Sequence, residues 1–489
     1  MRILLEMRPA LGGHAGIPQE TRLLFRGLNT LPGLEVQGML QSSTRLIAGG
    51  LRPSDERRSR DKQINRLSRV VVSLDTSGSS IPQQIVSRLR QGVAPWPVLG
   101  RTLLGLPQRL TSFEASPFRD FIWRNLFAKT LRDDDFELVT RAGYKVLRSP
   151  WTAMHASGLL TRPFGHALYP RVDTRGVDVM VAETPFPGRV DKSTQLVVRY
   201  HDAIPLLMPH TISDKSYHQA THYHALRRNV LDGAWFACVS EATRRDLLAV
   251  FPQAESKTLT IPNMVSHHYH EEPEGPQRIP EILRVRRNAA FQYAAATPVM
   301  GPDAQAFPYL LMVSTIEPRK NHQTLLAAWE RLRAQGFPWL HLVIVGSLGW
   351  DHKAIVKRFQ PWLARGGLHM LEDVPADELR LLYRHARVTV CPSFGEGFDY
   401  SGVEAMRCGG VVAASEIPVH RDVFGDAAAY FNPYSATGMA AVLAEVLSPH
   451  GEMRCAALRE RGGPISAQYV PERVLPKWQE FLTQIRPKP

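Results

Sequence analysis

Two glutamates with seven residues between them stand out in the C-terminal half of the chain. Glu396 and Glu404 lie in SFGEGFDYSGVEAM (393–406), where glycines precede a run that is typical of a helix. A carboxylate accepts two hydrogen bonds from a vicinal diol, so each glutamate could hold a sugar ring. Ser401 and Glu404 also fit the S-x-x-E pattern of a capping box, which would explain Glu404 without a ligand. Both interpretations stay open at this point.

A second candidate site is the basic pair Arg319 and Lys320 in STIEPRKNHQTLL (314–326), just before a predicted helix with Asn321 as its N-cap. A cation at a helix N-terminus is unfavourable by ~0.3–1 kcal/mol, whereas an anion there is stabilised. Two cations beside a helix N-terminus therefore predict a diphosphate site. The alternative is a solvated basic pair.

Two loops in the N-terminal half carry further candidates. Gly13 belongs to GGHAGIPQE (12–20), where glycines after a first strand let backbone N–H groups approach a phosphate. The alternative is a tight strand-to-helix turn. His201 follows a predicted strand, and its imidazole could donate to a phosphate or a sugar hydroxyl. The alternative is a histidine bonded to a backbone carbonyl.

Hydrophobic patterning predicts the strands that carry these loops. An apolar strand at 3–7, the glycine loop, a helix pattern and a second strand near 34–40 open a doubly wound α/β sheet, and strands at 177–185 and 195–205 continue it. A second alternation of buried strands and amphipathic helices begins at residue 307. Ligands bind outside the carboxyl ends of such strands, so we expect the four loops to line a cleft between two facing domains.

The length of 489 residues suits two or three domains. We predict an N-terminal Rossmann-like domain over 1–265 and a second Rossmann-like domain over 307–470; the resemblance described below implies that the first lies on the acceptor side and that the second binds the nucleotide sugar. Residues 266–306, rich in Pro, His, Glu and Ala, are the expected linker. A C-terminal helix over 471–489 is expected to pack back on the first domain. The α/β rhythm stops at about 44–142, which we interpret as an insertion.

Positive charge is concentrated in that insertion. The chain carries a formal charge of +13, and residues 44–132 contain 16 Lys and Arg against 6 Asp and Glu. Such a local excess indicates an anionic partner or a solvated surface insertion. No stretch approaches the ~20 apolar residues of a membrane-spanning helix, and the start MRILLEMRPALGG lacks the apolar core of a signal peptide. We therefore expect a cytoplasmic protein. The four cysteines form no CxxC pair, so neither a disulfide framework nor a zinc site is indicated.

Taken together, these motifs resemble glycosyltransferase family 4, a retaining family that uses nucleotide sugars and has the two-domain GT-B fold. The resemblance runs in order from about residue 195 to 440 and includes the N-terminal glycine loop, but not residues 44–142. The stretches that carry it are HDAIPLLMP, CVSEATRRDLL, STIEPRKNHQTLLAAW, CPSFGEGFDYSGVEAM and AASEIPVHRDVFGDAAAYFNP.

The resemblance implies a role for each candidate. Glu396 would face the donor sugar, Glu404 would hold the ribose, and Lys320 would bind phosphate. Three positions depart from the family pattern: Ser314 stands where many members have an arginine, and Asp399 and Ser401 stand where many read Gly and Pro. The implied catalytic residues are Glu396, His201 and Lys320, and the implied donor-binding residues are Gly13, Arg319, Lys320, Gly397, Phe398 and Glu404.

The resemblance also implies an activity. The expected reaction moves a hexose, with mannose favoured, from a nucleotide sugar such as GDP-mannose to a saccharide or polyprenol-linked acceptor in surface polysaccharide synthesis. No metal and no cofactor are expected. The alternatives are a UDP- or dTDP-sugar donor, or a non-catalytic protein that binds membrane or nucleic acid. Nucleic acid is not the expected partner, and an anionic membrane surface is a candidate partner of residues 44–132, through their charge and the aromatic stretch Phe118–Phe127.

Overall fold

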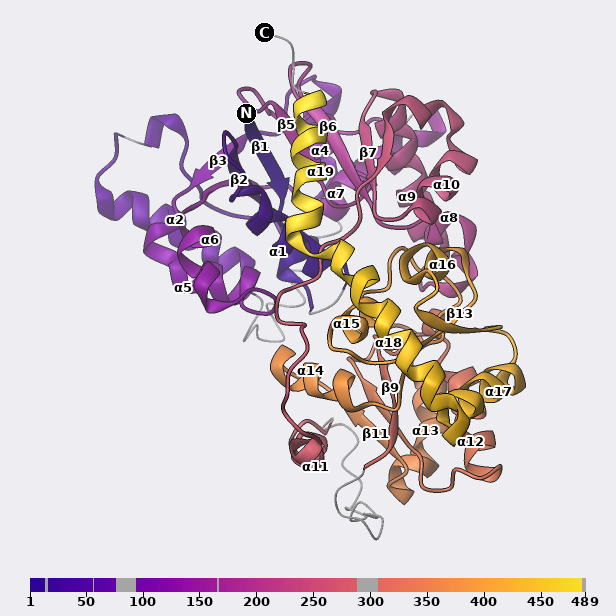
Figure 1. Cartoon of the computed structure of the whole chain (residues 1–489). Coiled ribbons are helices and arrows are strands. Elements are labelled where there is room, and N and C mark those ends of the chain that lie inside the picture. The colour runs from indigo at the N-terminus through magenta and orange to yellow at the C-terminus, as the bar shows by residue number, and fades with distance from the viewer. Residues whose placement is uncertain (14–15, 56, 76–93, 165–166, 288–306, 486–489) are drawn as a thin grey trace.

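A computed structural model describes residues 1–13, 16–55, 57–75, 94–164, 167–287 and 307–485. The chain forms two sheets that are each covered by helices, one above the other in Figure 1. Most strands are apolar along their whole length and buried, as is typical of parallel sheets with helices on both faces. The predicted pair of Rossmann-like sheets is therefore present.

The N-terminal sheet has eight strands in the order β3-β4-β2-β1-β5-β6-β7-β8. All neighbours are parallel except β3, which comes from the predicted insertion and pairs antiparallel with β4 at the edge. The order reverses between β1 and β5, so the loops after these two strands flank a switch point where ligands bind in such sheets. The strands are β1 (Arg2–Glu6), β2 (Glu35–Leu40), β3 (Leu110–Phe113), β4 (Gly143–Leu147), β5 (Val179–Ala182), β6 (Gln195–Tyr200), β7 (Trp235–Cys238) and β8 (Thr258–Thr260).

The C-terminal sheet has six parallel strands in the order β11-β10-β9-β12-β13-β14. In chain order this is the 3-2-1-4-5-6 arrangement of a dinucleotide-binding fold, with its switch point between β9 and β12. The strands are β9 (Tyr309–Val313), β10 (His341–Val345), β11 (Leu368–Leu371), β12 (Val388–Cys391), β13 (Val412–Ser415) and β14 (Ala428–Phe431).

Helices cover both faces of each sheet. In the N-terminal domain they are α1 (Ile17–Leu28), α2 (Arg60–Leu74), α4 (Pro95–Leu103), α5 (Arg119–Ile122), α6 (Phe136–Arg141), α7 (Trp151–Thr161), α8 (Ile204–Leu207), α9 (Lys215–Leu231) and α10 (Glu241–Val250). Further along the chain they are α11 (Ile279–Val285), α12 (His322–Ala334), α13 (Lys353–Arg365), α14 (Ala376–His385), α15 (Tyr400–Arg407), α16 (Pro418–Phe424), α17 (Ala436–Leu447), α18 (Glu452–Ser466) and α19 (Pro471–Gln484).

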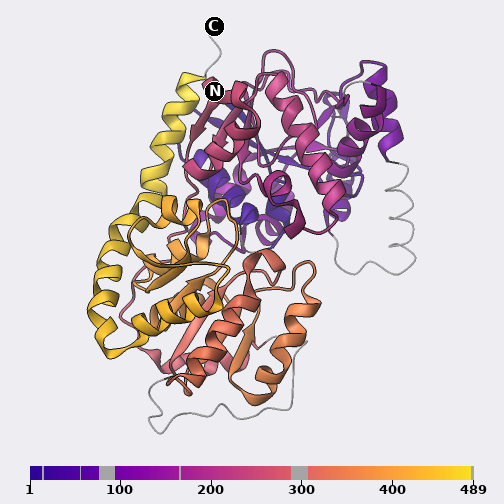
Figure 2. The same ribbon diagram turned by 90° about the vertical axis from the view of Figure 1, so that its right-hand side faces the viewer.

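The last two helices join the two domains. Figure 2 shows α18 along the C-terminal domain and α19 continuing beside the N-terminal one. Trp478 of α19 is fully buried in the core that α1 and the N-terminal sheet form. Within the predicted linker, α11 packs into the core of the C-terminal domain through Ile279, Ile282 and Leu283.

The aromatic stretch of the insertion lies differently from the prediction. Phe127 is fully buried and stacks on Phe25 of α1, with ring centroids 5.5 Å apart. Phe118, Phe121 and Trp123 pack partly buried against the same core. The predicted aromatic docking surface at Phe118–Phe127 is therefore wrong, because these rings anchor the insertion to the domain. No helix in the described ranges is long and apolar enough to cross a membrane.

Candidate functional site

The basic pair and the first glutamate meet at the switch point of the C-terminal sheet. Arg319 and Lys320 lie in a single turn (Pro318–Lys320) between β9 and α12, and Glu396 lies in the loop after β12. Asn321 stands at the predicted N-cap position with φ of 62°. Its side chain does not cap α12: it donates to the carbonyls of Pro392 (2.9 Å) and Pro433 (2.8 Å), and so fastens the two loops together.

Glu396 is held between the two cations. Lys320 Nζ lies 2.6 Å from Glu396 Oε1, and Arg319 Nη1 lies 2.8 Å from Glu396 Oε2. Burial by itself raises the pKa of Glu396, but the charges of Arg319 and Lys320 outweigh burial and hold that pKa below its ordinary value. Arg319 also pairs with Glu317 at 2.8 Å. The result is a compact, ionised cluster beside the N-terminus of α12.

The second glutamate faces the other domain. Glu404 accepts a hydrogen bond from Gln19 Nε2 of α1 (3.0 Å) and another from Tyr383 Oη (2.9 Å). Burial raises the pKa of Glu404 to about 7, although both hydrogen bonds favour the charged form. Glu404 and Gln19 therefore join the two domains directly.

The capping-box interpretation of Glu404 is wrong. The helix α15 begins at Tyr400, so Ser401 lies inside its first turn and cannot be the N-cap. Asp399 takes that position in the left-handed region (φ 64°), and Ser401 Oγ donates to Asp399 Oδ1 at 2.6 Å. His420 Nε2 lies 3.0 Å from the other Asp399 oxygen. Ser401 and Asp399 thus stabilise the loop, and Glu404 is left for contacts across the interface.

His201 lies at the carboxyl end of β6 and approaches the glycine loop of the other domain. Its backbone carbonyl is so close to Gly397 that a Cβ at Gly397 would lie 1.8 Å from that oxygen. Thr243 Oγ1 is within 3.3 Å of both the His201 and Gly397 carbonyls. Only glycine fits at position 397 in this arrangement. The predicted meeting of the two domains' loops is therefore seen at these residues.

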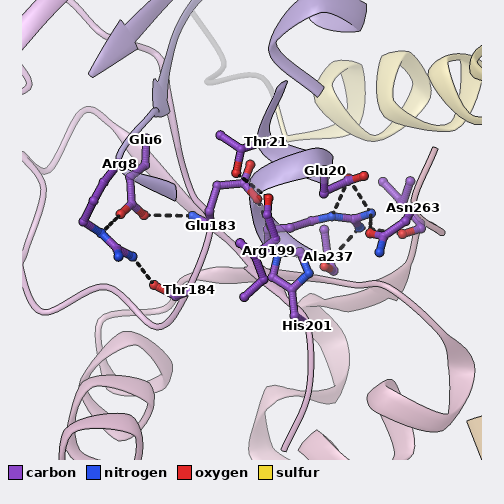
Figure 3. A network of polar contacts seen from close by, with 12 residues as sticks. Glu6, Arg8, Glu20, Thr21, Glu183, Thr184, Arg199, His201, Ala237 and Asn263 are labelled. Carbon is purple, nitrogen blue, oxygen red and sulfur yellow. Dashed lines mark hydrogen bonds and ion pairs between the residues drawn. The ribbon is translucent and has the colours of Figure 1, made fainter. Parts of the chain in front are cut away.

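A buried polar network occupies the N-terminal switch point, next to His201 (Figure 3). Arg199, on β6, pairs with Glu20 of α1 at 2.8 Å, and both side chains have no exposed surface. Arg199 also donates to Asn263 at 2.8 Å. Tyr400, from the C-terminal domain, donates to the second Glu20 oxygen at 3.0 Å. This network connects the first helix, the central strands and the start of α15.

Glu183 is a candidate that the sequence reasoning missed. It follows β5 directly, and its Oε2 lies 3.3 Å from His201 Nε2. Its other oxygen, Oε1, is buried and has no hydrogen-bond partner among the residues that the structure describes. Burial, together with the negative charges of Glu20 and Glu6, raises the pKa of Glu183 well above its ordinary value. Burial and the charge of Arg199 lower the pKa of His201, so both shifts favour the neutral form of the side chain concerned. The signal was an acidic residue at the end of the buried strand VDVMVAETP (177–185).

Two predicted donor-binding residues contribute through the backbone. A Cβ at Gly13 would meet no atom within 4 Å, and the Gly13 carbonyl accepts from Arg22 Nη1 at 3.0 Å. Its neighbours 14–15 lie outside the described residues. Phe398 is buried against Tyr400 and Tyr469, with ring centroids 5.3 and 5.0 Å away. The Phe398 ring therefore anchors the glycine loop, and only its backbone is available to a ligand.

The site combines three chemical abilities. The cations Arg319 and Lys320 and the N-terminus of α12 can stabilise negative charge. Glu396 and Glu404 can accept hydrogen bonds from hydroxyl groups. Glu183 and His201, whose pKa shifts both favour the neutral form, can exchange hydrogen bonds with a polar group. Among the described residues, no group of three or more His, Cys, Asp or Glu could hold a metal ion.

Comparison with known proteins identifies the C-terminal domain. Residues 303–462 match the family model described as Glycosyl transferases group 1. The O-antigen chain mannosyltransferase B of Escherichia coli is 26% identical over 265 residues, which cover 53% of this chain and 62% of that protein. The phosphatidyl-myo-inositol mannosyltransferase of Mycolicibacterium smegmatis is 29% identical over 226 residues, 42% of this chain and 57% of that protein. Both matches span less than two thirds of the relative's own length.

The solved structures bear on the fold. A sucrose-phosphate synthase from Thermosynechococcus elongatus aligns over 99% of this chain and 98% of its own, with a TM-score of 0.59 and 15% identity. Two parallel Rossmann-type sheets arranged as in this neighbour confirm the GT-B prediction.

Proposed function

We propose that this chain, whose residues 303–462 match the family model Glycosyl transferases group 1, is a retaining glycosyltransferase that moves mannose from GDP-mannose to a saccharide or polyprenol-linked acceptor. We also propose that it works in surface polysaccharide synthesis, without a metal or a cofactor, in the cytoplasm. The mannosyltransferases among its relatives support the sugar.

One observation carries the proposal: Arg319, Lys320 and Glu396 converge at the switch point of the C-terminal sheet. A donor diphosphate at the N-terminus of α12 would take the place of Glu396 as the partner of one or both cations. Glu396 would then turn an oxygen to a hydroxyl of the transferred sugar. The cations are placed before the reaction begins, so they stabilise the charge that develops as the anomeric C–O bond breaks.

Retention follows if the acceptor hydroxyl attacks the face from which the diphosphate leaves. The bond between the anomeric carbon and the acceptor oxygen forms while the bond to the diphosphate oxygen breaks, and that leaving oxygen takes the acceptor proton. The close approach of His201 and Gly397 would exclude water from the reacting sugar. Glu183, which contacts His201, would lie on the N-terminal side of the reacting sugar.

A donor panel tests the proposal. Purified protein is titrated with GDP-mannose, UDP-sugars and dTDP-sugars by calorimetry, and nucleotide release is followed without and with a chelator. We expect one donor to bind, with binding weakened about a hundredfold by Lys320→Ala, because a charge-assisted contact to the diphosphate is lost. Lys357→Ala on the exposed face of α13 is the matched control and should change nothing. Binding of a UDP- or dTDP-sugar instead would overturn the proposal that GDP-mannose is the donor. Failure of every donor to bind would overturn the proposed enzymatic activity.

A further inference from the structure

Asp202 is an acidic residue at the contact between the two domains. It follows His201 in the loop between β6 and α8, and it is partly buried. A Cβ at Gly397 would lie 3.4 Å from the Asp202 Cβ, so Asp202 lies against the loop that carries Glu396. The N-terminal domain therefore places a carboxyl group within electrostatic reach of the cations of the candidate site.

The two oxygens of Asp202 differ in their contacts. Oδ1 accepts a hydrogen bond from the Ile204 amide at 2.9 Å, which holds the side chain at the start of α8. Among the residues that the structure describes, Oδ2 accepts no hydrogen bond and Asp202 forms no ion pair. Oδ2 is therefore available to a ligand.

Two other carboxyl groups near Asp202 are paired with cations. Glu317 lies 2.8 Å from Arg319, and Glu396 pairs with both Arg319 and Lys320. We refer to these four residues and Asp202 as the charge cluster. Its carboxyl groups outnumber its cations, and within the described part of the chain Asp202 is the carboxyl group of the cluster that has no ion pair.

The surroundings of Asp202 shift it towards its protonated form. Burial raises the pKa of Asp202, the cations of the charge cluster offset this rise only in part, and Glu396 raises the pKa further. Tyr200 on β6 and Asp246 on α10 also interact with this carboxyl group, and neither brings a positive charge. The neighbouring His201 has a lowered pKa because it is buried, and α8 contributes no titratable side chain.

A bound donor would add negative charge to the charge cluster, because each phosphate of a nucleotide sugar is negatively charged at neutral pH. Two cations cannot balance a diphosphate and every carboxylate of a partly buried cluster, so uptake of a proton is favoured. Glu317 would keep its ion pair with Arg319, and Glu396 would turn to a sugar hydroxyl that donates to it. Asp202 has no such partner for its charged form, so protonation costs least there.

We propose that Asp202 is a further donor-binding residue, which takes up a proton from solvent when the donor binds and donates it in a hydrogen bond to an oxygen of the donor. A protonated carboxyl group has one O–H donor, and Oδ2 can supply it while Oδ1 stays bonded to the Ile204 amide. This assignment rests on the proposed function, because it requires a nucleotide-sugar donor.

The proposal gives the pH dependence of donor binding a definite sign. Because the donor raises the pKa of Asp202, its affinity is fully present below the pKa of Asp202 in the free protein. The affinity is lost progressively as pH rises from that value to the higher pKa in the complex. Within this window one linked proton changes the affinity by up to about tenfold per pH unit.

Calorimetry of the full chain tests the proposal. Wild type and Asp202→Asn are titrated with GDP-mannose, UDP-sugars and dTDP-sugars from about pH 5.5 to 8.5, in buffers that differ in their enthalpy of ionisation, so that the heat reports the protons taken up. The asparagine has the shape of a protonated aspartate and can still accept from Ile204. We expect wild type to take up as much as about one proton more than Asp202→Asn. The variant should bind the donor more tightly than wild type at high pH, a gain that a damaged fold would not produce.

Two further variants complete the test. Asp120→Asn on α5, where the side chain is 76% exposed, removes the same charge and should leave the uptake unchanged. Glu404, whose pKa is about 7, is present in wild type and in Asp202→Asn, so the difference between these two proteins reports Asp202. Equal uptake by these two proteins, or a loss of uptake in Glu317→Gln in place of Asp202→Asn, would overturn the assignment. Donor binding without this difference would overturn the assignment alone, whereas failure of every nucleotide sugar to bind would overturn the proposed function as well.

Discussion

Glu183 and Glu396 occupy matching places in the two sheets and behave in opposite ways. Each follows the strand across the switch point from the first strand of its sheet, β5 in one domain and β12 in the other. Both side chains are almost fully buried. The pKa of Glu183 is raised well above its ordinary value, whereas the pKa of Glu396 is lowered.

Local charge explains the difference better than burial does. Glu396 touches two cations, while Glu183 lies among other carboxyl groups, and Arg199 is already paired with Glu20. The same fold thus places two cations on the buried carboxylate at the C-terminal switch point, whereas burial favours the protonated form of Glu183 at the N-terminal one. Under the proposed function, the first would hold the donor diphosphate and the second would face the acceptor.

The largest expected effect comes from removing the cation of the N-terminal network. Arg199→Met leaves Glu20 buried without its ion pair, and breaking such a pair costs about 3–5 kcal/mol of the free energy of unfolding. Urea denaturation followed by circular dichroism measures the loss. Arg358→Met, on exposed α13, should cost less than about 0.5 kcal/mol. A loss at Arg199 no larger than at Arg358 would show that the ion pair between Arg199 and Glu20 does not stabilise the folded protein.

The second largest effect is expected at Glu396, and it is an effect on catalytic activity. Glu396→Gln removes the charge between Arg319 and Lys320 and should lower turnover about a hundredfold, because the sugar-facing carboxylate and the order of both cations are lost. Nucleotide release with GDP-mannose is the measurement. An unchanged rate would mean that Glu396 serves only to neutralise the cations before the donor binds.

Glu404, at the contact between the two domains, is expected to make the free energy of unfolding depend on pH. Its pKa is about 7 in the folded state, against about 4.3 in an unfolded chain. The folded protein therefore binds more protons over this window, and the stabilisation is present below about pH 4 and lost as pH rises to 7. The stability difference between wild type and Glu404→Gln should fall by up to about 1.4 kcal/mol per pH unit there. Urea denaturation from pH 5 to 8 checks it, and a difference that rises with pH would contradict the assignment.

The smallest effect is expected at Glu183. Burial favours the protonated form of Glu183, and Glu183→Gln replaces that form by a neutral group of similar shape. Stability at pH 7 should change by less than about 1 kcal/mol and turnover by less than about fivefold. Glu183→Ala, which leaves His201 without a partner, should cost more on both measures. A Gln variant as damaged as the Ala variant would show that the ionised carboxylate is required.

The sheets could be predicted from the sequence because buried parallel strands are nearly continuous apolar runs. The antiparallel edge strand β3 could not, since LTSF has four residues and no strong pattern. Motifs placed Arg319, Lys320 and Glu396 on the correct loops. Their mutual pairing was not foreseen, because nothing in one loop's sequence specifies which side chain of another loop it meets.

The N-terminal network was missed for a related reason. Glu20 looks like an ordinary acidic residue in the first turn of a helix, and Arg199 looks like an exposed position of a strand. Arg199 in the middle of the apolar run QLVVRY was nevertheless a signal, since a charge inside a buried parallel strand needs a buried partner. The capping-box prediction was wrong because the start of the helix was misplaced: α15 begins at Tyr400, one residue before Ser401.

Glu404 already accepts a hydrogen bond from Gln19, so a ligand hydroxyl has to compete with Gln19 for this carboxylate. The amide of Gln19 donates to Glu404 within the same molecule, so it competes at a fixed, high effective concentration with any hydroxyl that a ligand brings. A ligand that uses Glu404 must first displace Gln19. The apparent affinity of that ligand is its intrinsic affinity multiplied by the fraction of molecules in which the Gln19 hydrogen bond is broken. Because Gln19 and Glu404 belong to different domains, occupancy of Glu404 by a ligand also changes how firmly the two domains are joined.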